Sequence, residues 1–242
     1  KLGDLLSANA FYEGNLTITN LGQLANAHEM IKTGADDPTI TVKGHVKVVV
    51  TAANGLKDSI ASVQLILNKL RSIQGTVTLT SEVDASLPAL TYVVGDADLN
   101  GSDGKAKLSA EKLLTVDKNM SITGITGAIS LATLGSVGDV TIGGFSKNVT
   151  VTSVDFSGMT QGKVQTEAGK LILPGATSVK LGGELPAVVT LAKCTEFAHG
   201  GAVKQPALDL TLGGKNATLS LNSAEFTGEV TITTTGDILL PG

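Results

Sequence analysis

The sequence predicts a mainly β protein, a parallel β-solenoid whose turns are each about twenty residues long. Three observations lead to this prediction: short apolar–polar–apolar runs, their regular return along the chain, and the glycine-containing turns that follow them. The runs begin at Leu16, Ile40, Val77, Ala97, Val140, Val154, Leu171, Val189, Leu208 and Val230. Each run makes a short strand with one apolar face, and stacked turns would bury these faces in one continuous core.

Two internal comparisons indicate a true repeat. The segment from Ser86 to Gly101 aligns with the segment from Ser130 to Gly144, since both read Ser-Leu, Leu, Val, Gly-Asp, strand, Gly. Residues 169–175 return as residues 236–242, and both segments end in Leu-Pro-Gly. Glycine adopts positive φ without a steric clash, so it lets a coil turn at a fixed place. The alternative is a β-sandwich, whose strands would return every 8–12 residues or so.

We treat residues 1–242 as a single repeat domain. Residues 1–75 are predicted to form an N-terminal capping region, and residues 76–242 the regular coils. The capping region contains both expected helices, at Leu21–Lys32 and Leu56–Ile73, although residues 63–67 could equally form a strand. The second has one apolar face, made by Leu56, Ile60, Val63, Leu67 and Leu70. Residues 100–105 and 198–206 interrupt the repeat and are expected to protrude as loops that add binding specificity.

The composition limits the core and the partners. Hydrophobic residues make up 42% of the chain but aromatic residues only 3%, so the core must be built from Val, Leu, Ile and Ala. The net charge is −4 and Arg71 is the only arginine, which argues against a nucleic-acid groove. No stretch reaches the 18 or so apolar residues of a membrane span.

Four residues are the candidate binding site: Asp96, Asp98, Asp103 and His199. Asp96 and Asp98 flank Ala97 and so share a strand face, with Asp103 in the following loop. Three acids at this spacing could hold Ca²⁺, but the EF-hand pattern is absent and a plain exposed face is the favoured interpretation. His199 stands in a glycine-rich segment, and we interpret it as a solvent-facing loop histidine because no nucleophile or metal pattern accompanies it.

The remaining distinctive residues have structural interpretations. The single cysteine, Cys194, excludes an internal disulfide and is expected to be a small buried apolar residue. Phe156, Phe197 and Phe226 each lie near the end of a repeat and are expected to fill the core. Threonine pairs that share a strand face suggest an ice-binding surface as a third class of function, but they recur in only some coils. These pairs are Thr17 and Thr19, Thr76 and Thr78, Thr150 and Thr152, and Thr231 and Thr233.

Residues 131–142 read Leu-x-x-Leu-x-x-Val-x-x-Val-x-Ile, and in this the chain resembles divergent leucine-rich-repeat and receptor L-domain-like solenoids of bacterial, Bacteroides-type surface proteins. The resemblance covers residues 76–242, and a parallel β-helix stays open as the alternative. It implies a secreted or cell-surface location, with a lipid anchor on a removed N-terminal segment as one route. It also implies a module for adhesion, binding host or bacterial protein or glycan, and it assigns no catalytic residue.

The competing function is a polysaccharide lyase or hydrolase built on a β-helix. Glycosidases use two carboxylates across the scissile bond, and lyases commonly combine Ca²⁺-binding acids with a basic residue. Here the acids are scattered, and the only adjacent pair, Asp36 and Asp37, precedes Pro38 in a predicted turn. We therefore expect a non-enzymatic protein without a cofactor or metal. An exposed terminal coil would favour edge pairing, which suggests a homodimer.

Overall fold

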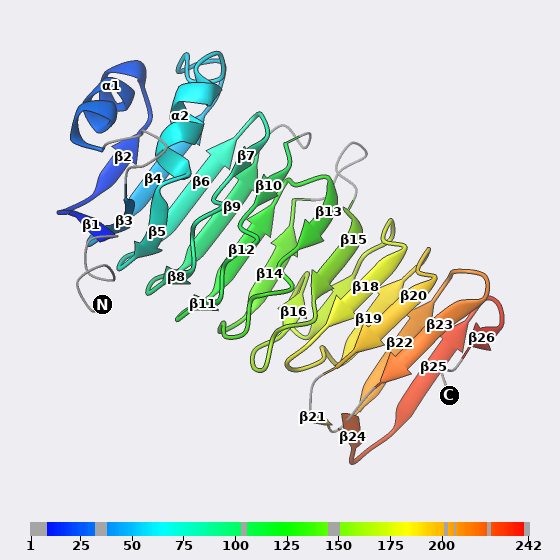
Figure 1. Ribbon diagram of the computed structural model, residues 1–242. Helices are drawn as coiled ribbons and strands as arrows, with labels where there is room; N and C mark the ends of the chain where they lie inside the picture. Colours follow the sequence, from blue (N-terminus) through cyan, green and yellow to red (C-terminus); the bar gives the residue numbers. More distant parts are fainter. Residues whose placement is uncertain are drawn as a thin grey trace.

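The computed structural model describes residues 9–31, 38–102, 106–144, 151–200, 203–205, 207–221 and 224–239. The protein is an elongated stack of coils, with two helices beside the first strands (Figure 1). Strands account for 46% of the chain and helices for 9%, and the sheets are parallel. The predicted mainly β, parallel solenoid class is therefore confirmed.

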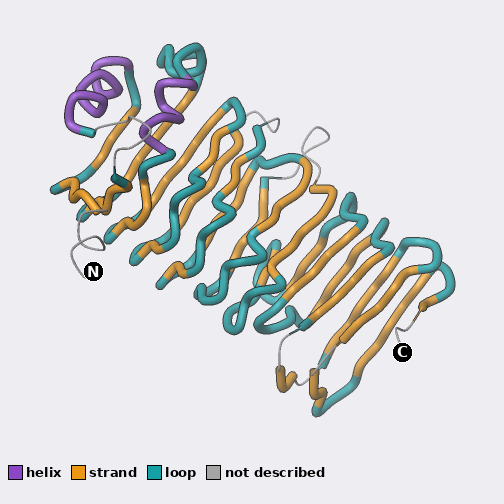
Figure 2. The backbone as a smooth tube through the Cα atoms, viewed as in Figure 1, coloured by secondary structure: helices purple, strands orange, loops and turns teal. Residues whose placement is uncertain are grey.

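In the N-terminal part of the stack, successive strands of one coil belong to different sheets, which run along the stack as separate faces (Figure 2). The first face is a five-stranded sheet of β1 (Asn9–Tyr12), β3 (Thr39–Val42), β5 (Leu70–Ile73), β8 (Tyr92–Val93) and β11 (Thr115–Val116). The second face is a seven-stranded sheet of β2 (Leu16–Ile18), β4 (Val46–Val50), β6 (Val77–Ser81), β9 (Ala97–Gly101), β12 (Met120–Thr123), β14 (Val140–Gly143) and β16 (Val164–Gln165).

The other strands complete the coils. A six-stranded sheet forms the third face, with β13 (Gly127–Ser130), β15 (Val151–Phe156), β18 (Ser178–Leu181), β20 (Glu196–His199), β23 (Ala217–Leu221) and β26 (Ile238–Leu239). A four-stranded sheet, whose first strand directly follows β16 in the chain, consists of β17 (Lys170–Ile172), β19 (Val188–Leu191), β22 (Leu208–Leu212) and β25 (Val230–Thr234). Two short sheets pair β7 (Ala85–Ser86) with β10 (Leu108–Ser109) and β21 (Val203–Gln205) with β24 (Ala224–Phe226).

All ten predicted apolar runs lie in strands, but they come from four different sheets. Ile40 belongs to the first face, Val77 to the second and Val154 to the third, so the period seen in the sequence mixes the faces of the coil. Within one face the repeat is clear, because Val77 pairs with Ala97 and Ala97 with Met120. These register partners set the turn length at about twenty residues.

Alternation of buried and outward side chains builds the core. In β6, Val77 and Leu79 are buried, whereas Thr78 and Thr80 point outward. The same pattern recurs in neighbouring strands, so the inward residues stack into one continuous apolar core, as expected for a solenoid. Phe156 and Phe197 are fully buried, and Phe226 is half-buried and packs against this core, so the expectation for all three is confirmed.

The first predicted helix is present as α1 (Leu21–Met30), while Lys32 lies outside the described residues. Asn20 begins the helix, because its side-chain oxygen accepts the backbone N–H of Gln23 at 2.9 Å. Buried Leu24 and Ala27 make its packed face. The helix forms where the sequence predicts it, because the spacing of its apolar residues and the N-cap at Asn20 both favour a helix there.

The second predicted helix, Leu56–Ile73, is wrong at both ends. Helix α2 covers only Ile60–Leu67, and Leu70–Ile73 is strand β5. The pairing of β3 with β5 shifts register between Ile40 and Thr41, so Arg71 is an extra residue. That bulge lets Leu70 and Ile73, three residues apart, both face the core, a spacing that imitates helical periodicity.

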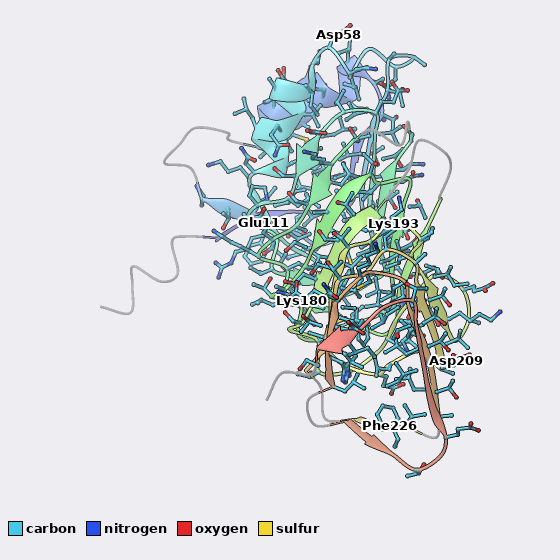
Figure 3. All side chains as sticks on the ribbon, turned by 90° about the vertical axis from the view of Figure 1, so that its right-hand side faces the viewer. Asp58, Glu111, Lys180, Lys193, Asp209 and Phe226 are labelled. Carbon is cyan, nitrogen blue, oxygen red and sulfur yellow. The ribbon has the colours of Figure 1, made fainter. Side chains whose placement is uncertain are left out.

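The stack of coils also continues across residue 75, where the capping region was predicted to end. β2 and β4 belong to the same sheet as β6, so regular strands begin well before that position. At the other end, Val230 and Ile232 of β25 are 37% and 41% exposed, although Leu208 and Leu210, their partners in β22, are buried. Asp58, beside the helices, and Phe226, in β24, mark the two ends of the stack in Figure 3.

Candidate functional site

Two of the four predicted site residues lie together on the second face. Asp96 directly precedes β9, and Asp98 is inside it; both side chains are half-buried and point away from the core. Asp103 lies outside the described residues. His199 belongs to β20, a strand of the third face, so the structure does not group it with Asp96 and Asp98.

An open depression surrounds Asp96 and Asp98. Its lining consists of Thr76, Asp96, Asp98, Asn119, Met120, Ser121 and Thr141, which come from four successive coils. All but Met120 carry a hydroxyl, amide or carboxyl group. Most residues of the lining thus offer a hydrogen-bonding group, on an otherwise regular sheet face.

Outward residues of neighbouring strands stand in register across this surface, and three of them, Asp98, Ser121 and Thr141, line the depression. Thr78 of β6 pairs with Asp98 of β9, Asp98 with Ser121 of β12, and Ser121 with Thr141 of β14. We call Thr78, Asp98, Ser121 and Thr141 the central column. Parallel strands lie about 4.8 Å apart, so the column presents one polar side chain per coil at that interval along the stack.

Beside the central column runs a second row, at the residue that precedes each strand of the second face. This row, the ladder, consists of Asn15, His45, Thr76, Asp96, Asn119, Asp139 and Lys163. Several of its side chains accept the backbone N–H of the next member. Asn15 accepts from His45 at 2.8 Å, and the Nδ1 of His45 accepts from Thr76 at 2.9 Å.

The ladder resumes at Asp96. Asp96 accepts the backbone N–H of Asn119 at 3.2 Å, and Asn119 accepts that of Asp139 at 3.0 Å. Asp139 in turn accepts the backbone N–H of Lys163 at 3.2 Å. One carboxylate oxygen of Asp96 is therefore engaged in holding the coils together, a role that the sequence interpretation missed.

The electrostatics of the depression distinguish the two aspartates. Partial burial, and secondly the negative charge of Asp96, raise the pKa of Asp98 above its ordinary value. In the described part of the chain, we find no hydrogen bond to the Asp98 carboxylate, whereas the Asp96 carboxylate accepts one from the backbone N–H of Asn119. Asp98 is thus the carboxyl group best placed to exchange its solvent contacts for those of a ligand.

His199 contradicts the expectation of a solvent-facing loop histidine. It is a strand residue with no exposed surface, stacked between Leu181 and Leu221 of the adjacent strands. Its Nε2 lies 2.9 Å from the carbonyl oxygen of Gly183, and its Nδ1 is buried without a partner. Burial lowers the pKa of the imidazole, so the neutral form is favoured. Its position in the core accounts for the wrong prediction.

The loop predicted at residues 198–206 is wrong in its described part. Ala198 and His199 complete β20, and Val203–Gln205 forms β21, which pairs with β24. In the other predicted loop, Asn100 and Gly101 belong to β9, while residues 103–105 lie outside the described residues. Neither segment offers a described loop that could add specificity.

Cys194 is buried as expected. Its thiol donates to the carbonyl oxygen of Glu196 at 3.0 Å, and desolvation raises the pKa of the thiol to about 11. The thiolate is therefore scarce at neutral pH, which fits a structural residue. Threonine pairs do not form a continuous array on the second face, because Thr78 has Lys47 and Asp98 as its neighbours along the stack.

The first face carries exposed groups that the sequence analysis did not single out. Tyr92 of β8 donates its hydroxyl proton to the carboxylate of Asp117, and this bond raises the pKa of the tyrosine. The ammonium of Lys43 lies 5.1 Å from the centre of the Phe11 ring and 2.6 Å from Glu13. The sequence could have revealed this face only if the register of its strands were known.

Within the described residues, no three His, Cys, Asp or Glu side chains gather closely enough to hold a metal ion. In the same part of the chain, neither helix has the length and apolar character needed to cross a membrane. Comparison with known proteins found no matching family model, no matching curated protein and no matching solved structure.

Proposed function

We propose that this protein is a non-catalytic interaction module that binds glycan through the outward surface of its seven-stranded sheet. The observation that carries the proposal is the polar depression around Asp98, where hydroxyl, amide and carboxyl groups line an open hollow. Sugars present many hydroxyl groups, and each can donate to or accept from such side chains. The rigid sheet holds these groups in place before binding, which reduces the entropic cost of association.

The proposed location is outside the cell or at its surface, with adhesion as the biological role. This part rests on the sequence resemblance to leucine-rich-repeat and L-domain-like surface solenoids. Protein binding is the alternative use of the same surface, since a flat polar sheet face can also meet a protein. A homodimer through the exposed end of the stack is proposed separately, from the exposure of Val230 and Ile232.

One observation favours an enzyme as a second candidate. Asp98 has a raised pKa and lies near a second carboxylate, and glycosidases use such a pair as general acid and partner. Against this, Asp96 already accepts the backbone N–H of Asn119 through one oxygen. Its carboxylate is therefore partly committed to the ladder.

A glycan array and a set of soluble polysaccharides, tested with and without Ca²⁺, would distinguish these functions. Saturable binding without release of reducing ends or unsaturated products supports the proposal, and its loss in Asp98→Asn places the ligand in the depression. Turnover that disappears in Asp98→Asn supports the enzyme. A blank array overturns glycan binding and directs the search to protein partners.

A further inference from the structure

We infer that the ligand of the second face is an extended, uncharged polysaccharide whose chain runs along the axis of the stack, over the central column. The inference rests on the proposed function, because it takes glycan binding at this depression as given. It adds the chemical class of the glycan, its direction and the length that is recognised.

The spacing of the coils supports a chain that runs along the axis. Thr78, Asp98, Ser121 and Thr141 are register partners in neighbouring strands, so their side chains succeed one another at about 4.8 Å. One sugar unit in a straight β-linked chain advances by nearly the same distance. A chain along the axis can therefore place each successive sugar over one coil. Neighbouring sugars of a straight β-1,4-linked chain face opposite ways, so the same contacts recur at every second coil.

The shape of the surface supports the same direction. The residues that line the depression come from four neighbouring coils, from Thr76, which precedes β6, to Thr141 of β14, so the hollow crosses the coils. A chain that followed a single strand would instead pass over Asp96, Asp98 and Asn100 of one coil. Asn100 is not among the residues that line the depression. The hollow thus extends across the coils.

The charge of the depression supports an uncharged chain. Asp96 and Asp98 lie within the depression, and Asp139 precedes β14 at its border. Within the lining there is no lysine or arginine to neutralise an acidic polymer. An anionic polysaccharide would therefore be repelled at the middle of the column, whereas the hydroxyl groups of a neutral chain can donate to the carboxylates.

The column also sets the length of the chain that is recognised. Four coils contribute to the depression, and at one sugar per coil about four units would fill it. Further units would lie beyond the lining and add little. Affinity should therefore rise with chain length and then stop rising.

Cello-oligosaccharides of two to six units test this inference by isothermal titration against the whole chain. We expect the affinity to rise up to about four units and to stay constant beyond that length. Thr141→Ala should weaken binding of the tetramer roughly fivefold, the effect of one lost hydrogen bond. The dimer is expected over the coils of Asp98 and Ser121, so its binding should stay unchanged. Asn100→Ala, on the same strand as Asp98, is the matched control and should leave every length unaffected.

The outcomes separate this inference from the proposed function. Equal affinity for all lengths, or a larger effect of Asn100→Ala than of Thr141→Ala, overturns the axial chain while glycan binding stands. Preference for polygalacturonate over the neutral oligomers overturns the uncharged class. If no cello-oligosaccharide binds, the inference fails, but the proposed function fails only if the glycan array is blank as well.

Discussion

The carboxylate of Asp96 accepts the backbone N–H of Asn119, the residue that occupies the same place one coil later, at 3.2 Å. Asn119 repeats the interaction with Asp139 at 3.0 Å. These side chains lie where the chain enters each strand of the second face, so they fix the height of one coil on the next. The ladder and the proposed binding depression thus share Asp96 and Asn119.

Asp96→Ala should therefore lower the free energy of unfolding by about 1 kcal/mol, because the backbone N–H of Asn119 loses its acceptor. Asp96→Asn keeps an acceptor oxygen and should be nearly neutral. Urea denaturation followed by far-ultraviolet circular dichroism would measure both. If the asparagine variant is destabilised as much as the alanine variant, charge matters at this position and the ladder does not.

The raised pKa of Asp98 predicts how the stability of the fold changes with pH. Its pKa is raised in the folded protein, so the folded state holds the proton more tightly than the unfolded state. Its contribution to stability is fully present below pH 3.8, the unfolded value, and is lost as the pH rises through the folded value. Asp98→Asn should therefore gain stability relative to the natural protein on going from pH 3 to pH 7. An unchanged difference would contradict the raised pKa.

The lowered pKa of His199 predicts that stability changes with pH in the opposite direction. Burial lowers its pKa, so its contribution is present above pH 6.5, the unfolded value, and is lost as the pH falls toward the folded value. Glu196, in the same strand, pairs with Lys180, and exposed Glu184, next to the Gly183 that His199 contacts, pairs with Lys163.

His199→Leu matches the leucines above and below it in the stack and should remove this acid sensitivity between pH 6.5 and pH 5. Thermal melting across that range measures the effect. The natural protein, melted in the same buffers, serves as the control. If the acid sensitivity persists in His199→Leu, a different group causes it.

The sequence could predict the strands but not the ladder or the buried histidine. Apolar–polar–apolar runs identify a strand whatever its partner, which is why Val77, Ala97 and Val140 were placed correctly. The ladder depends on which residues share a position in successive coils, and the polar residues just before these strands would reveal it only once the register is known. His199 follows Phe197 at a spacing of two, which is the inward position of a strand. Its glycine-rich surroundings suggested a loop instead.

The exposed end of the stack predicts self-association. β25 contains no charged residue and no proline, so it lacks the usual protection of an edge strand. A dimer that grows with concentration should appear in light scattering, and Ile232→Lys should abolish it by placing a charge on that strand. Lys215→Ala, at an exposed turn, is a neutral control. A monomer at every concentration would contradict pairing through β25.

Glycan binding by the second face is tested by measuring binding and turnover in the same samples for the natural chain and Asp98→Asn. We expect saturable binding of a neutral polysaccharide by the natural chain, no release of products, and loss of binding in the variant. Thr211→Ala, on the four-stranded sheet, should bind as the natural chain does. Binding that survives in Asp98→Asn, or product release by the natural chain, would contradict non-catalytic glycan binding at Asp98.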